Sequence, residues 1–342
     1  MNDKLRWGIM GTGHIAGVFA EDMAQSDTAT LLAIGSRSQE TADRFGDQYG
    51  IERRYSDYDS LLQDPDVDIV YITTPHPMHE KWAIRAAEAK KHILCEKPLA
   101  MNFNQAKRII DAVRTHDVFL MEAFMYRCHE QTRRIIELIQ SKKIGEVRII
   151  QAAFCFRHPY DLEHRVLNAD LGGGGILDIG CYPVSMSRLV AGIAAGTDFA
   201  DPIAFSAQGH IGEASRVDEY TVAIAKFPGD VLAQLACGVQ VEQENVVRIF
   251  GTEGSLYIPQ PWQPGRDRKP AFLYLTQRGK SQVEEIQVDS EKGLWAIEAD
   301  LVAEGDAFGL AAVLAADADL DVRTGFACPF AGHLYQFTDP FL

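Results

Sequence analysis

The chain of 342 residues has few basic side chains and no long hydrophobic run, which argues against two common classes of partner. Its 33 Lys and Arg are outnumbered by 48 Asp and Glu, giving a formal charge of −15 without the basic patch that nucleic-acid binding requires. No uninterrupted apolar run reaches the roughly 18 residues of a membrane-spanning helix. The start, MNDKLRWGIMG, also lacks the apolar segment of a signal peptide. We therefore expect a cytoplasmic protein with neither a nucleic-acid nor a membrane partner.

The cysteines lack the spacing of a metal or redox site. No C-x-x-C pair occurs among Cys95, Cys128, Cys155, Cys181, Cys237 and Cys328. The histidines likewise match no metal-ligand cluster. Because a structural disulfide is disfavoured in a reducing compartment, we expect thiols that pack in the interior, and no metal.

The first part of the chain alternates between strand-like and helix-like segments. Short apolar runs rich in β-branched residues lie at 5–10, 30–35, 67–74, 92–96 and 118–122, with helix-like stretches at 38–49, 78–90 and 102–116. This alternation is typical of a doubly wound parallel sheet. We therefore predict an α/β protein whose residues 1–123 form a Rossmann domain.

The pattern changes after about residue 124. Longer runs with antiparallel character lie at 146–157, 203–211, 217–227, 231–241, 246–250 and 282–288, and a last helix is expected at about 293–317. Turn signals such as Gly251-Thr252-Glu253-Gly254 separate several of them. We predict that residues 124–342 form an α+β domain with an open, mainly antiparallel sheet.

A glycine-rich turn follows the first predicted strand. Gly11-Thr12-Gly13-His14-Ile15-Ala16 matches the G-x-G-x-x-A fingerprint in which glycines admit a pyrophosphate to a helix N-terminus. An ordinary glycine turn is the alternative, but the position after strand one favours a dinucleotide site.

The end of the second strand distinguishes NADP from NAD. An acidic residue there would hold a ribose 2′-hydroxyl, whereas this chain reads Gly35-Ser36-Arg37-Ser38. Arg37 can pair with a 2′-phosphate, with Ser36 adding a hydroxyl, so NADP is favoured over NAD. The alternative is that Arg37 is a solvated residue at a helix start.

Candidate chemical groups follow two further elements. Glu96-Lys97-Pro98 ends a predicted parallel strand, at the edge where open α/β sheets bind ligands, and Pro98 restricts the direction of Lys97. Asp178 and Tyr182, just after the glycines at 172–175, lie four residues apart and would share one face of a helix. A nearby ammonium lowers the pKa of a tyrosine, so Lys97 beside Tyr182 would favour proton transfer. The alternatives are that Asp178 is an acidic residue of the first helical turn and that Tyr182 is an aromatic residue of the core.

Several remaining polar residues have two interpretations. His76 and His79 follow Thr74-Pro75 at a strand end and either contact the cofactor or pack within a loop. The residues Arg157, His158, His164 and Arg165 are either substrate contacts or solvated loop residues.

These motifs together resemble the Gfo/Idh/MocA oxidoreductases over nearly the whole chain. Tyr182, where many members have histidine, and the segment Glu122–Arg127 are similar to the branch that contains glucose–fructose oxidoreductase, dimeric dihydrodiol dehydrogenase and NADP-dependent D-xylose dehydrogenase. The resemblance implies a Rossmann domain followed by an open-sheet domain whose outer face often makes a dimer. It also implies that Lys97 and Tyr182 are catalytic, with Asp178 as their companion, and that Arg37 binds NADP.

The expected function is hydride transfer between NADP(H) and a secondary alcohol or carbonyl of a sugar or related cyclic diol, in a homodimer or higher homo-oligomer. Tyr182 would be the acid/base assisted by Lys97, although Lys97 itself could fill that role. The predicted cofactor contacts are Gly11, Thr12, Gly13, His14, Ile15, Ser36, Arg37, Thr74, Pro75, His79, Glu96 and Lys97. The predicted substrate contacts are Lys97, Arg127, Arg157, Asp178 and Tyr182. The alternatives are a redox-neutral glycoside-cleaving enzyme and a non-catalytic NADP-binding sensor.

Overall fold

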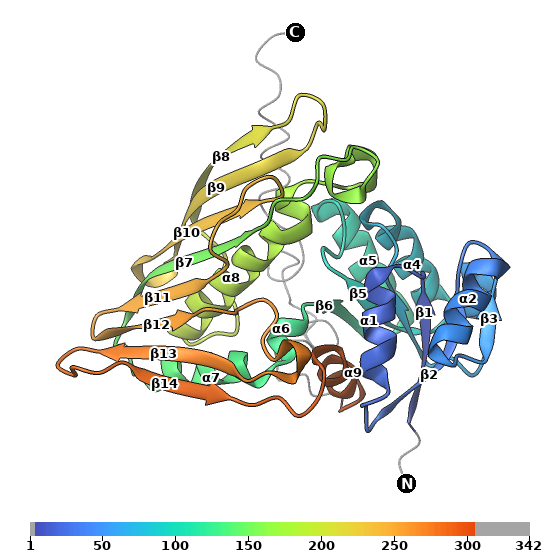
Figure 1. Ribbon diagram of the computed structural model, residues 1–342, viewed down its shortest axis with the longest axis horizontal. Coiled ribbons are helices and arrows are strands. Elements are labelled where there is room, and N and C mark those ends of the chain that lie inside the picture. Colours follow the sequence, from blue (N-terminus) through green and yellow to red (C-terminus); the bar gives the residue numbers. More distant parts are fainter. Residues whose placement is uncertain (1–3, 305–342) are drawn as a thin grey trace. The chain divides into compact units, whose positions relative to one another are not determined.

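The computed structural model describes residues 4–304, which divide into two compact units (Figure 1). The N-terminal unit contains the chain up to Cys128 together with the segment that starts at Glu291. The second unit contains His129–Ser290.

The N-terminal unit is built on a six-stranded parallel sheet, as predicted. The strand order is β3-β2-β1-β4-β5-β6. The strands are β1 (Leu5–Met10), β2 (Ala29–Gly35), β3 (Arg53–Tyr55), β4 (Ile69–Ile72), β5 (His92–Glu96) and β6 (Leu120–Ala123). The order reverses between β1 and β4, and ligands of open α/β sheets bind at the carboxyl ends of the strands beside such a point.

Helices connect these strands. They are α1 (His14–Met23), α2 (Gln39–Tyr49), α3 (Tyr58–Gln63), α4 (His79–Glu88), α5 (Phe103–His116) and the short α6 (Met125–Cys128). Ser38, Asp57 and Asn102 begin α2, α3 and α5 by accepting a first-turn backbone N–H, which explains where these helices start.

The helix α9 (Leu294–Glu304) also belongs to the N-terminal unit, which corrects the assignment of all residues 124–342 to the second domain. It packs against α1 and α6. Its Asp300 accepts hydrogen bonds from the Ser26 and Thr28 hydroxyls and from Lys292, and so ties α9 to the start of β2. The rest of the helix predicted at 293–317 lies outside the described residues.

The second unit is built on an eight-stranded, mainly antiparallel sheet. Its order is β14-β13-β12-β11-β7-β10-β9-β8, and of the strand pairs described within this sheet only β7–β10 is parallel. The strands are β7 (Val147–Cys155), β8 (Ala204–Ile211), β9 (Asp218–Phe227), β10 (Val231–Gly238), β11 (Val247–Gly251), β12 (Gly254–Ile258), β13 (Ala271–Gln277) and β14 (Glu284–Val288). The predicted fold class is confirmed, although β3, β12 and β13 were missed.

One face of this sheet is covered by helices (Figure 1). They are α7 (Glu130–Gln140) and α8 (Cys181–Ala195), of which α8 packs on β7 and β10. The helical run Ala169–Ala195 is long and apolar enough, by length and composition alone, to cross a membrane. Since 89% of its most apolar window is buried, it also fits a core helix of this unit.

Candidate functional site

The predicted dinucleotide turn lies at the carboxyl end of β1. Gly11 has φ +114°, and a Cβ atom there would lie 2.7 Å from the Thr73 hydroxyl, so the position requires glycine. At Gly13 a Cβ atom would meet nothing within 4 Å, which leaves open space at the start of α1. His14 is exposed and Ile15 is half-buried at the same helix start.

The unsatisfied polar groups at this edge fit a dinucleotide. The helix α1 has no side-chain cap and no acidic residue in its first turn, so its N-terminal N–H groups are available to a phosphate. Thr74, at the end of neighbouring β4, has a buried hydroxyl without a hydrogen-bond partner among the described residues. A bound pyrophosphate would occupy the open space at Gly13. Its oxygens would accept hydrogen bonds from the uncapped N–H groups of α1 and from the Thr74 hydroxyl.

The end of β2 presents hydroxyls and one exposed cation. Ser36 is buried and its hydroxyl pairs with that of Thr41, while Ser38 caps α2 by accepting the Thr41 N–H. Arg37 is exposed beside this helix start. A helix N-terminus, hydroxyls and a guanidinium are suited to a 2′-phosphate.

The end of β5 holds Lys97 over a buried carboxylate. Glu96 accepts hydrogen bonds from the Tyr71 hydroxyl and from the backbone N–H of Lys97, the latter at 3.2 Å. Lys97 is half-buried, and its peptide bond to Pro98 is cis. Glu96 thus contacts the backbone of Lys97. The contact of Glu96 with a cofactor stays a prediction.

His79 is held by protein contacts at this edge, and its predicted contact with the cofactor stays a prediction. The ring is fully buried, with Nδ1 2.9 Å from the Pro98 carbonyl and Nε2 2.8 Å from the Thr74 carbonyl. Burial lowers the pKa of His79, which keeps the imidazole neutral. The ring therefore links the ends of β4 and β5, whereas Pro75 beside it is exposed.

In the second unit, the glycine run lies between a loop and the helix start. A Cβ atom at Gly173 would lie 2.7 Å from the carbonyl oxygens of Arg165 and Val166, so the backbones pack directly together. Gly174 has φ +107°, and a Cβ atom there would overlap the Asp218 carboxylate. The run therefore allows the backbone before the helix to approach the Arg165–Val166 loop and the Asp218 carboxyl group closely.

The helix after the glycines starts with a π turn, which corrects the geometry assumed for Asp178 and Tyr182. Residues Ile176–Gly180 are π-helical, and the α-helix α8 begins at Cys181. The Cys181 N–H donates to the Ile176 carbonyl, five residues earlier. Asp178 thus lies in the wide turn and Tyr182 in the first α turn, so their spacing of four is not that of one α-helical face.

Asp178 is buried and forms an ion pair with Arg165. The Arg165 Nη1 lies 2.9 Å from Asp178 Oδ1, and the two side chains are 49% and 4% exposed. Sequence reasoning considered Arg165 only as a substrate contact or solvated residue. The ion pair instead places a half-exposed guanidinium against the carboxylate.

Tyr182 is enclosed by aromatic rings that sequence reasoning did not identify. Its ring centroid lies 5.3 Å from that of Phe154 on β7 and 5.8 Å from that of Trp262. Trp262 is anchored by its indole N–H, which donates to the Ala153 carbonyl at 2.8 Å. These contacts restrict the ring orientation and hence the direction of the phenol group.

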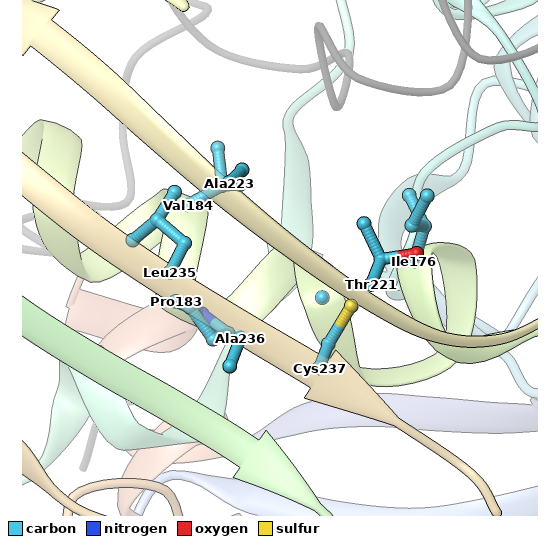
Figure 2. Close-up of a pocket in the computed structure, with 9 residues that line it drawn as sticks. Ile176, Pro183, Val184, Thr221, Ala223, Leu235, Ala236 and Cys237 are labelled. Atoms are coloured by element: carbon cyan, nitrogen blue, oxygen red, sulfur yellow. The ribbon is translucent and has the colours of Figure 1, made fainter. Parts of the chain in front are cut away.

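A small cavity lies beneath the helix start, between the helix and the sheet. It measures about 20 Å³, enough for about one water molecule. Figure 2 shows Ile176, Pro183 and Val184 of the helical run together with side chains of β9 and β10, including Thr221 next to its register partner Cys237. The Thr221 hydroxyl is buried and has no hydrogen-bond partner among the described residues.

The remaining predicted substrate residues lie in different parts of the chain. Arg127 is half-buried, with its guanidinium 4.5 Å from the centre of the Phe124 ring in the N-terminal unit. Arg157 is exposed beyond the end of β7. Because Lys97 and Arg127 belong to one unit and Asp178, Tyr182 and Arg157 to the other, their convergence on one substrate stays a prediction.

Family models match both units. Residues 5–124 match the model of an oxidoreductase family with an NAD-binding Rossmann fold, Gfo/Idh/MocA, and residues 132–257 match that of the GFO/IDH/MocA C-terminal domain.

Individual proteins are similar over most of the chain or over part of it. A trans-1,2-dihydrobenzene-1,2-diol dehydrogenase from Xenopus laevis is 34% identical over 262 residues, covering 76% of this chain and 77% of the relative. A D-xylose 1-dehydrogenase (NADP(+)) from Haloferax volcanii is 37% identical over 188 residues, covering 55% and 58%. The structure of a 3-ketoreductase from Actinomadura kijaniata, in complex with NADP and TDP-benzene, gives a TM-score of 0.78 at 27% identity, covering 89% and 90%.

Proposed function

The chain belongs to the Gfo/Idh/MocA oxidoreductase family, and on this basis we propose an NADP(H)-dependent dehydrogenase that acts on a secondary alcohol or carbonyl of a sugar or cyclic diol. The observation that carries the proposal is the setting of Tyr182. A buried tyrosine, held by two aromatic rings, follows a buried carboxylate on a helix that starts with a π turn. The diol and xylose dehydrogenases among the similar proteins support the substrate class.

The N-terminal unit offers groups for each part of NADP. The first-turn N–H groups of α1 after Gly13 and the Thr74 hydroxyl would bind the pyrophosphate. Arg37, with Ser36 and the N-terminus of α2, would bind the 2′-phosphate and so favour NADP over NAD. When bound, the nicotinamide supplies or accepts the hydride.

The protein residues provide proton transfer and orientation. Tyr182 would give its phenolic proton to the substrate oxygen in reduction and take it back in oxidation. Lys97 would donate a hydrogen bond to the same oxygen and stabilise its negative charge. Asp178, held by Arg165, would bind a neighbouring substrate hydroxyl instead of activating Tyr182, since a nearby negative charge raises the pKa of a tyrosine.

The variant Tyr182→Phe tests the proposal, because it removes the proton and leaves the ring. We expect kcat to fall by about 100-fold or more, the usual size of an acid/base contribution, while NADPH affinity measured by fluorescence titration is unchanged. Tyr274→Phe is the matched control, since Tyr274 lies on β13 of the same unit, three strands from β7. Turnover of a panel of aldoses, ketoses, inositols and dihydrodiols that stays at the wild-type level in Tyr182→Phe would refute the role.

We also propose that a second copy of the chain binds the face of the eight-stranded sheet opposite α7 and α8, which no described helix covers. Large apolar side chains are exposed there, among them Val222 at 57%, Ile224 at 57% and Leu232 at 44%. A flat apolar sheet face of this kind suits a symmetric interface. Ile224→Glu should convert a dimer to a monomer in light scattering, and Val283→Glu, at an exposed residue just before β14, should not. A wild-type monomer at micromolar concentration would contradict the proposal.

A further inference from the structure

Asp218, the first residue of β9, lies against the start of the helix that carries Asp178 and Tyr182. Its Oδ2 accepts the Ile176 N–H at 2.7 Å. The residue is only 8% exposed. The first turn of the helix, which has no side-chain cap of its own at Gly175, is therefore capped by a residue from a distant strand.

The glycine run is shaped to admit this carboxyl group. A Cβ atom at Gly174 would overlap Asp218 Oδ1, and one at Gly175 would lie 3.2 Å from Oδ2. Gly174 also has φ +107°, which places its N–H and carbonyl in an arrangement that other residues rarely adopt. The absence of side chains at these two glycines thus leaves the space that the Asp218 carboxyl group occupies.

Two charged residues of this region, Arg165 and Glu219, have partners other than Asp218. Arg165 pairs with Asp178. Glu219, the next residue on β9, accepts hydrogen bonds from Tyr160 and Ser215. The contacts of Asp218 are therefore mainly with backbone N–H groups at the helix start, so its position and that of the π turn depend on each other.

We propose that Asp218 is a positioning residue for proton transfer, because its carboxyl group fixes the π turn and thereby the placement of Asp178 and Tyr182. The inference rests on the proposed function, in which Tyr182 is the acid/base. Misplacement of a reacting group by about 1 Å can cost on the order of 100-fold in rate, so a small shift of the helix start is enough to affect catalysis.

Three variants probe this contact from both sides. Asp218→Ala removes the acceptor, Asp218→Asn retains one acceptor oxygen, and Gly174→Ala places a methyl group where the carboxylate lies. We expect Asp218→Ala and Gly174→Ala to lower kcat by roughly 10- to 100-fold with unchanged NADPH affinity, and Asp218→Asn to recover most of the loss. The solvent deuterium isotope effect on kcat should rise and the pH profile of kcat/KM should shift in the two impaired variants, because proton transfer becomes slower.

Asp300→Asn is the matched structural control. Asp300 is also 8% exposed and accepts several hydrogen bonds, but at the amino end of β2, opposite the dinucleotide edge. It should lower the unfolding temperature and leave the isotope effect and pH profile unchanged.

The proposal is overturned if Asp218→Ala behaves like Asp300→Asn, losing activity only in proportion to folded protein. Should Asp218→Ala not fold, an unchanged isotope effect and pH profile in Gly174→Ala overturns it equally. Failure of the proposed function is distinguished separately, because it would appear as full turnover in Tyr182→Phe.

Discussion

Folding of the protein should be linked to proton uptake at Asp218. Burial raises the pKa of this carboxyl group to about 7, against the opposing effect of its backbone hydrogen bonds. The pKa in the unfolded chain is close to the ordinary 3.8. Because the folded-state pKa is the higher, the contribution of Asp218 to stability is complete below about pH 4 and is lost as the pH rises through about 7.

The size of the effect follows from these two pKa values. A difference of about 3 between them corresponds to an upper limit of roughly 4 kcal/mol, of which about 2.5 kcal/mol falls between pH 5 and pH 8. Asp218→Asn lacks the titrating group and should not lose this part of the unfolding free energy. Relative to wild type, the variant should therefore gain stability steadily from pH 5 to pH 8.

Urea unfolding of both proteins at intervals from pH 5 to pH 8 measures this difference. The difference is needed because other buried carboxyl groups titrate equally in both proteins and cancel. A difference that stays constant to within about 0.5 kcal/mol would refute the reasoning. It would mean that the backbone hydrogen bonds of Asp218 offset the cost of burial and keep it ionised throughout.

Three further outcomes are expected. Arg37→Asp should shift the ratio of kcat/KM for NADP to that for NAD by about tenfold or more toward NAD, because charge-assisted hydrogen bonds to the 2′-phosphate are lost. An unchanged ratio would count against the assignment of Arg37 to the 2′-phosphate. Thr221→Val should raise the unfolding free energy by about 1 kcal/mol by removing an unpaired buried hydroxyl, and a decrease would show that the hydroxyl is bonded within the cavity. Burial raises the pKa of Glu298, whose oxygens have no partner among the described residues, so Glu298→Gln should match wild type in stability near pH 4 and exceed it near pH 9. Coinciding stability curves would contradict that last expectation.

Those parts of the fold that depend on local pattern were predictable. The strands β1, β4 and β5 are mostly apolar because helices cover both faces of a parallel sheet, and that composition is visible without any knowledge of neighbours. The strand β3, with the sequence Arg-Arg-Tyr, is an edge strand of 3 residues and carries no such signal. The segment is a strand because it pairs with β2 at the edge of the sheet, and its composition does not indicate this.

The domain assignment failed where contacts span the whole chain. The Asp300 carboxylate accepts the Ser26 hydroxyl across 274 positions, and no periodicity in α9 indicates which unit that helix joins. Sequence order suggested the second unit, whereas a polar network at the start of β2 places α9 in the first.

The candidate site divides in the same way. Gly11 and Gly13 belong to one local motif and Arg37 directly follows the second strand, so their positions and a chemical role can be predicted from the sequence. The neighbours of Tyr182 cannot be predicted in this way, since Phe154 lies on β7 and Trp262 on a loop distant in the sequence. Only the register of the strands and the path of that loop bring these residues together.

The glycine run at 172–175 shows why a motif can be recognised before its cause is known. Glycine at this density is typical of a backbone that another group approaches closely. Within the second unit, the group that approaches is the Asp218 carboxylate, 42 residues beyond Ile176, and the run also packs on the loop that carries Arg165. Because a methyl group at Gly174 and the loss of the carboxylate disrupt the same contact, their effects on Tyr182 should be coupled instead of additive. The glycines, the carboxyl group and the π turn therefore depend on one another: the glycines admit the carboxyl group, and the carboxyl group holds the start of the π turn.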